Sequence, residues 1–221
     1  MIHTLRALTL TIALVALSAS AEAASRVFII HGIPGVNVDV YASLAGAPIP
    51  ATPAVAGFTP KQIVDLQAFP GTFDIRIFVA GANPQTATPV IAVLGATIPD
   101  NVELSILAHL SGAGAPTATI YRNDNGPVAQ GSARVSVRHA AQAPAVQLNA
   151  GGVPKLALTN PYFGDLEVPA TTIPLQLVVP FTSTAITPVA PLGFASGTRY
   201  FVYAIGSVSG GTFDFILQAV R

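Results

Sequence analysis

Two short stretches of the chain share one pattern, and this pattern decides the expected fold. The first is Arg26-Val27-Phe28-Ile29-Ile30-His31, and the second is Arg134-Val135-Ser136-Val137-Arg138-His139. Each is a strand-like run that ends on a histidine, and a second alternating run begins seven residues later, at Val38 and at Val146. Because the strands and turns return in the same order, the sequence predicts two copies of one domain.

Alternation between apolar and polar residues dominates the rest of the chain. In residues 73–79, apolar side chains alternate with Asp74 and Arg76, as expected for a strand with one buried and one solvated face. Turn residues such as Pro70-Gly71 separate these runs at intervals of about 8–12 residues. The sequence therefore predicts an all-β protein with two tandem immunoglobulin-like antiparallel β-sandwich domains after a cleavable signal peptide.

The expected boundaries follow from the repeat. Residues 1–23 have a basic start, an apolar segment and the small-x-small motif Ala21-Glu22-Ala23, which predicts a signal peptide cleaved before Ala24. An uncleaved anchor is the alternative, although the apolar segment is shorter than the roughly 20 residues of a membrane span. The first sandwich is expected over 24–122, a linker over 123–133 and the second sandwich over 134–221. The mature chain is expected in the periplasm or outside the cell, without a membrane span.

The composition excludes several classes of protein. Only 9% of the residues are charged, with 10 basic and 10 acidic side chains, and no basic patch could follow a nucleic-acid backbone. The chain has no cysteine, which excludes disulfides and a lipid-modified cysteine anchor. Each domain must therefore be stabilised by core packing, for which 51% hydrophobic residues provide the material.

The order of these motifs resembles the bacterial domain of unknown function 4397. That family has a strand ending in histidine, a proline- and alanine-rich turn, and a strand ending Asp-Val-Tyr. Here His31 and His139 fill the first element, and Asp39 and Tyr41 match the last in the first copy only. A later Pro-(Gly/Ala)-Thr turn occurs in both copies. The resemblance covers nearly the whole mature chain and implies a tandem sandwich protein of the bacterial envelope, but no reaction.

His31 and His139 are the principal candidate site residues, with Asp39 and Tyr41 beside the first. A paired metal site would need further ligands, and Asp39 is expected on a neighbouring strand. The favoured interpretation is that each histidine binds backbone groups of the turn that follows it. His109 is expected at the surface. No catalytic, cofactor-binding or metal-binding residues are assigned.

Other chemistry has weaker support in the sequence. The glycines of residues 206–210 surround Val208 rather than a nucleophilic serine. Residues 123–125 of the linker offer few of the six to eight oxygens that calcium prefers. An aromatic platform for sugars would have to be built from Tyr41, Tyr121 and Tyr162 without any tryptophan.

The sequence is therefore interpreted as a secreted or periplasmic, non-enzymatic binding or structural protein of the bacterial cell envelope. The expected partners are an envelope protein, a glycan, or a second copy paired through strand edges, for which the apolar run 213–220 is the candidate. No cofactor is expected. The alternatives are a carbohydrate-binding or carbohydrate-processing accessory module and, third, a catalytic envelope enzyme.

Overall fold

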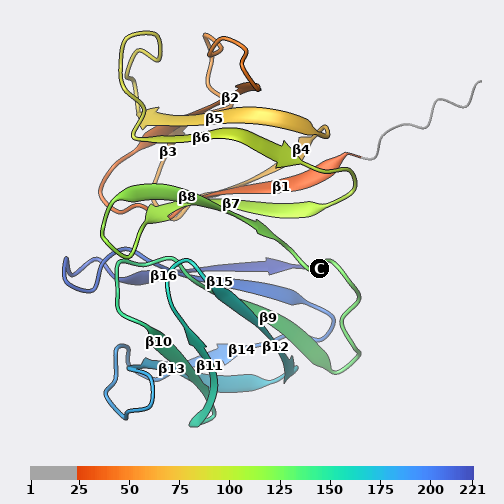
Figure 1. The fold of residues 1–221 in the computed structure, drawn as a ribbon. Coiled ribbons are helices and arrows are strands. Elements are labelled where there is room, and N and C mark those ends of the chain that lie inside the picture. Colours follow the sequence, from red (N-terminus) through yellow and green to blue (C-terminus); the bar gives the residue numbers. More distant parts are fainter. Residues whose placement is uncertain (1–23) are drawn as a thin grey trace, which may run out of the picture.

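The computed structural model describes residues 24–221, so the signal peptide expected over 1–23 lies outside the described residues. The described residues form sixteen β-strands in four four-stranded sheets, which are stacked as two sandwiches (Figure 1). No helix that could cross a membrane occurs within this part of the chain. The prediction of an all-β protein built from two sandwiches is confirmed.

The first sandwich consists of an outer sheet and an inner sheet, and the inner sheet faces the second sandwich. The outer sheet has the order β3 (Val55–Phe58), β2 (Val38–Leu44), β5 (Gly71–Val79), β6 (Ile91–Ile98). The inner sheet has the order β4 (Ile63–Ala68), β1 (Ser25–His31), β7 (Glu103–Leu110), β8 (Pro116–Arg122).

The second sandwich repeats this strand order element by element. Its inner sheet has the order β12 (Phe163–Pro169), β9 (Ser132–His139), β15 (Arg199–Ile205), β16 (Asp214–Val220). Its outer sheet has the order β11 (Val153–Leu158), β10 (Val146–Ala150), β13 (Thr172–Val178), β14 (Ala190–Gly193). Each inner sheet also contains one parallel pair, β1 with β7 and β9 with β15, which alternation in the sequence could not reveal.

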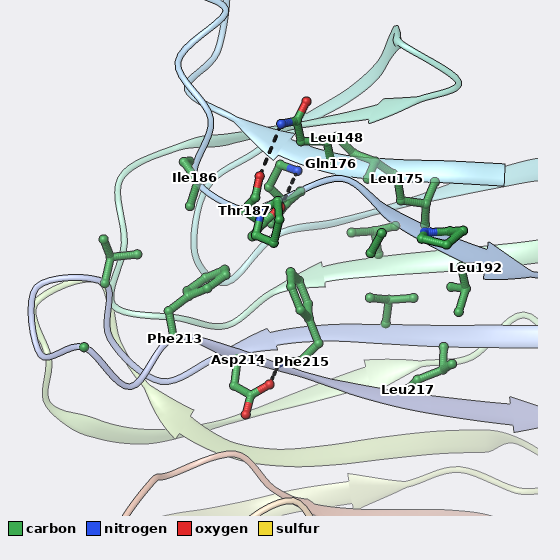
Figure 2. Close-up of a pocket in the computed structure, with 18 residues that line it drawn as sticks. Leu148, Leu175, Gln176, Ile186, Thr187, Leu192, Phe213, Asp214, Phe215 and Leu217 are labelled. Carbon is green, nitrogen blue, oxygen red and sulfur yellow. Dashed lines mark hydrogen bonds between the residues drawn. The ribbon is translucent and has the colours of Figure 1, made fainter.

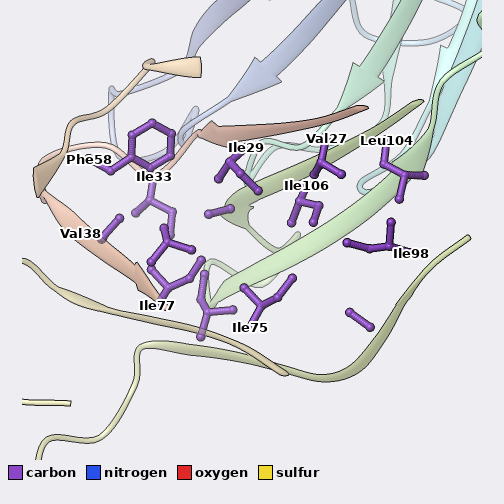
Figure 3. Close-up of a cluster of buried hydrophobic side chains, with 14 of the residues drawn as sticks. Val27, Ile29, Ile33, Val38, Phe58, Ile75, Ile77, Ile98, Leu104 and Ile106 are labelled. Atoms are coloured by element: carbon purple, nitrogen blue, oxygen red, sulfur yellow. The ribbon is translucent and has the colours of Figure 1, made fainter. Parts of the chain in front are cut away.

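The matching registers allow positions in the two sandwiches to be compared. Ile29 lies opposite Ile106 in the first sandwich, and Val137 lies opposite Val202 in the second. The core of the first sandwich is filled by branched aliphatic side chains and Phe58 (Figure 3). A corresponding core lies between the sheets of the second sandwich.

A third apolar cluster lies between the two inner sheets and joins the sandwiches. It includes Phe28, Ile30 and Leu107 from the first sandwich, and Phe201 and Tyr203 from the second. Both faces of each inner sheet are therefore covered, and seven of the eight residues of β7 are buried. The two domains therefore pack face to face through their inner sheets.

Polar groups accompany the apolar cluster at this interface. Glu103 and Arg199 occupy equivalent positions and form a bidentate ion pair between the sandwiches, with N–O distances of 2.7 and 3.1 Å. The fully buried Arg138 donates to the hydroxyl of Tyr203 at 3.0 Å and to Oδ1 of Asn123 at 2.5 Å. Its guanidinium also lies 4.5 Å from the ring centroid of Tyr121. These directional bonds favour one relative placement of the two sandwiches.

Candidate binding site

The two repeated histidines bind the turns that follow them. His31 Nε2 donates to the carbonyl of Val36 at 2.8 Å, and its Nδ1 accepts from the backbone N–H of Ile33 at 3.3 Å. His139 repeats the first bond with Pro144, at 2.9 Å, and receives a weaker contact from the following turn. Burial lowers the pKa of both imidazoles, which favours the neutral form. With both ring nitrogens engaged, neither histidine presents a free lone pair to a metal.

Asp39 and Tyr41 also contact other parts of the first sandwich instead of lining a site. The Asp39 carboxylate accepts from the backbone N–H groups of Gly57 at 2.7 Å and Gly81 at 2.8 Å, so it connects β3 with the turn after β5. Tyr41 is buried and packs edge-on against Phe78. The four candidate residues therefore do not converge on one site. Within residues 24–221, no group of three or more histidine, cysteine or acidic side chains is arranged to hold a metal ion.

The expectation that His109 lies at the surface is wrong. Its side chain is fully buried, its Nδ1 donates to the carbonyl of Leu110, and its Nε2 accepts from the hydroxyl of Thr119, each at 2.8 Å. In β7, Ile106 and Ala108 face the core of the first sandwich, so His109 points to the opposite face of the strand. That face is covered by the second sandwich instead of water, which is the reason for the error.

Two of the three tyrosines considered for a sugar platform are buried. Tyr121 lies in the interface between the sandwiches, where its hydroxyl donates to the carbonyl of Pro161 and burial raises its pKa to about 12. Tyr41 is buried as well, and only Tyr162 is exposed. In the linker, Asp124 forms an ion pair with Arg134 at 2.7 Å, while Asn123 accepts from Arg138.

A cavity lies between the two sheets of the second sandwich, and it is called the second-sandwich pocket. Its volume of about 640 Å³ falls within the roughly 300–1,000 Å³ typical of ligand sites. The walls come from both sheets and from the loops before β14 and β16, with mostly aliphatic and aromatic side chains (Figure 2). Phe213 and Phe215 point into this space from below, and Leu175 and Ile186 lie across from them. Asp214 points away from it.

The pocket exists because one edge of the second sandwich is incomplete. In the first sandwich, Ile77 pairs with the buried Ile91 at the start of β6. The equivalent position of β13 is Leu177, because Ile77 and Leu177 lie opposite the matching residues Val40 and Leu148. Leu177 has no partner in β14, which begins two positions later in this comparison and has four residues against eight in β6.

Smaller residues deepen the same space from the inner sheet. Val137 and Val202 stand where the first sandwich has Ile29 and Ile106. At the rim, Phe215 and Leu217 remain 36% and 46% exposed, although their side chains are on the strand face that points between the sheets. The second-sandwich pocket is therefore open to solvent at an edge lined by large apolar side chains.

The polar groups of the pocket are few and already engaged. The Gln176 amide donates to the carbonyl of Thr187 at 3.2 Å, and the Thr187 hydroxyl accepts from the backbone of Leu177 at 3.0 Å. Asp214, at the margin, forms an ion pair with Lys61 of the first sandwich. The pocket therefore offers apolar contact and shape, with little charge. Sequence reasoning missed this pocket, because the shortness of β14 and the smaller size of Val137 and Val202 can be recognised only from the observed strand registers.

By its fold, the protein is a tandem β-sandwich protein whose two domains share one strand order. The chain belongs to the family of the domain of unknown function DUF4397, whose family model matches residues 25–149. That match covers the first sandwich, β9 and all but the last residue of β10. Assignment of the whole second sandwich to the family remains a prediction, based on its strand order. No curated protein matches the chain.

Proposed function

We propose that the protein is an exported, non-enzymatic binding protein of the bacterial cell envelope, and that it holds an apolar ligand in the second-sandwich pocket. The observation that carries this proposal is a cavity of about 640 Å³, open at one edge of a sandwich whose counterpart in the same chain is filled. Export is supported by the features of residues 1–23, namely a basic start, an apolar segment and Ala21-Glu22-Ala23.

The lining determines the chemistry of the ligand. Of the polar side chains, Gln176 donates to the backbone carbonyl of Thr187, and the Thr187 hydroxyl accepts from the backbone N–H of Leu177. Asp214 is paired with Lys61. A charged ligand would lose its hydration without gaining a partner, so the pocket favours an uncharged, hydrocarbon-rich molecule. A ligand that buries about 300 Å² of apolar surface gains roughly 7 kcal/mol before the cost of association, which corresponds to micromolar or weaker binding.

The uncharged fluorescent probe N-phenyl-1-naphthylamine tests this proposal, because its emission rises in apolar surroundings. The mature protein is expected to bind it saturably at one site. Val202→Phe, which enlarges a side chain of the inner sheet, and Ala190→Leu, which does so from the outer sheet, are each expected to weaken binding at least tenfold. Both residues line the pocket.

The matched control is Leu94→Gln, which alters an exposed leucine on the first sandwich and is expected to leave binding unchanged. Circular dichroism and thermal melts would establish that each variant is folded. Absence of saturable binding by the unmodified protein would contradict the proposal. If Val202→Phe and Ala190→Leu bound the probe as tightly as the unmodified protein, the probe would bind outside the pocket. That result would also contradict the proposal.

A further inference from the structure

The edge strand β16 has little protection against pairing with another strand. Four other edge strands, β8, β11, β12 and β14, contain a proline, which lacks a backbone donor and discourages pairing; these are Pro116, Pro154, Pro169 and Pro191. β16 has seven residues without proline, glycine or lysine, and its single charge is Asp214 at the first position. It therefore presents a regular row of backbone donors and acceptors.

The side chains of β16 are unevenly covered. Ile216, Gln218 and Val220 are buried against the first sandwich, so the strand is firmly held from that side. Phe215 and Leu217, on the pocket face, are exposed. At the equivalent positions of β8, Ala118 and Ile120 pack against the core of the first sandwich. Exposed apolar side chains that lie together in this way mark a surface that contacts a partner.

We propose that the cover is a second copy of this chain, whose β16 pairs antiparallel with β16 of the first copy around a two-fold axis. Full overlap of two seven-residue strands places Leu217 opposite Leu217 of the other copy, because Leu217 is the middle residue. Such an isologous contact joins two four-stranded inner sheets into one continuous sheet.

The sequence of β16 is complementary to itself in this register. Phe215 lies opposite Ala219 of the other copy, so a large side chain meets a small one on the pocket face at both ends. The open edges of the two second sandwiches then face each other. This inference does not depend on the proposed ligand.

Sedimentation equilibrium of the mature protein between 1 and 200 µM tests the inference. The expected mass at high concentration is twice that of the monomer. Leu217→Lys places like charges opposite each other at the axis and is expected to weaken dimerisation at least tenfold. A monomer throughout this range, or a dimer that Leu217→Lys does not weaken, would overturn the inference.

A second variant uses the absence of cysteine from the chain. Leu217→Cys is expected to form a covalent dimer under mild oxidation at least ten times faster than Leu94→Cys, whose cysteine is exposed on the first sandwich. Equal rates would contradict pairing at β16. A monomeric protein that still binds N-phenyl-1-naphthylamine would leave the proposed function intact while removing the dimer, so the two failures are distinguishable.

Discussion

Three buried histidines link the stability of this protein to pH. Burial is the main cause that lowers the pKa values of His31, His109 and His139 below 6.5. In the unfolded chain these groups bind protons near pH 6.5, whereas in the folded chain they stay neutral to lower pH. Their contribution to stability is therefore complete above pH 6.5 and is lost as the pH falls below 6.5 toward their folded-state pKa values.

We expect the free energy of unfolding in urea to decrease between pH 7.5 and pH 5.5, a range above the titration of ordinary carboxyl groups. His109→Gln keeps hydrogen-bonding capacity next to Thr119 but does not titrate, so this variant is expected to show a smaller decrease. A stability that is constant, or that increases, on acidification through this range would contradict the assignment of neutral buried imidazoles.

At the residue scale, the sequence predicted the hydrogen-bonding role of the two repeated histidines, but it did not predict which other side chains are buried. The favoured interpretation of His31 and His139 as groups that bind the following turn agrees with their observed hydrogen bonds, because a turn's backbone groups need local partners. His109 was expected at the surface, and Tyr41 was considered for a sugar platform, because alternation only reports which residues point away from the core of their own sandwich. It cannot report that a second sandwich or a T-shaped aromatic contact covers the other face.

At the scale of elements, the close approach of the two inner sheets depends on a glycine. A Cβ added to Gly32 would lie 2.9 Å from Cγ2 of Ile205 in the other sandwich and 3.0 Å from the carbonyl oxygen of Ala108. One of these neighbours is backbone, so local side-chain movement alone cannot relieve the crowding. The turn after β1 is thus fitted closely to the end of β15.

Gly32→Ala is expected to destabilise the protein by about 1–3 kcal/mol, the usual cost of overpacking a well-packed interior. Gly112→Ala is the matched control, because a Cβ there meets no atom within 4 Å. Chemical denaturation of both variants measures the difference. A Gly32→Ala protein as stable as the Gly112→Ala protein would show that the sandwiches do not approach as closely as described.

Strand positions were predictable from alternation, whereas strand partners were not. The run 213–220 was recognised as a candidate edge, and β16 does lie at the edge of an inner sheet. The parallel pairing of β1 with β7 depends on contacts more than 70 residues apart in sequence, which periodicity does not encode. The shortness of β14 became meaningful only when its register was compared with that of β6.

At the scale of the whole molecule, the two sandwiches are joined by a buried interface in addition to their separate cores. The apolar cluster between the inner sheets, the buried Arg138 and the ion pair of Glu103 with Arg199 all need both domains. Separate unfolding would expose this surface and leave Arg138 without its partner Asn123.

We therefore expect one cooperative thermal transition, with equal calorimetric and van't Hoff enthalpies. Differential scanning calorimetry of the mature protein measures this directly. Two resolved transitions would show that the interface contributes little to stability. A glycine-serine insertion between Gly126 and Pro127, within the linker, is expected to leave the single transition in place, because the shared interface and not the linker joins the domains.

The second-sandwich pocket is the central claim, and methyl NMR tests it most directly. In protein labelled at leucine and valine methyl groups, titration with N-phenyl-1-naphthylamine is expected to shift Leu148, Leu177, Val202 and Leu217. Methyl groups of the first-sandwich core, such as those of Val27 and Leu104, are expected to stay unchanged. Shifts confined to the first sandwich, or no saturable shifts in the second, would contradict the account.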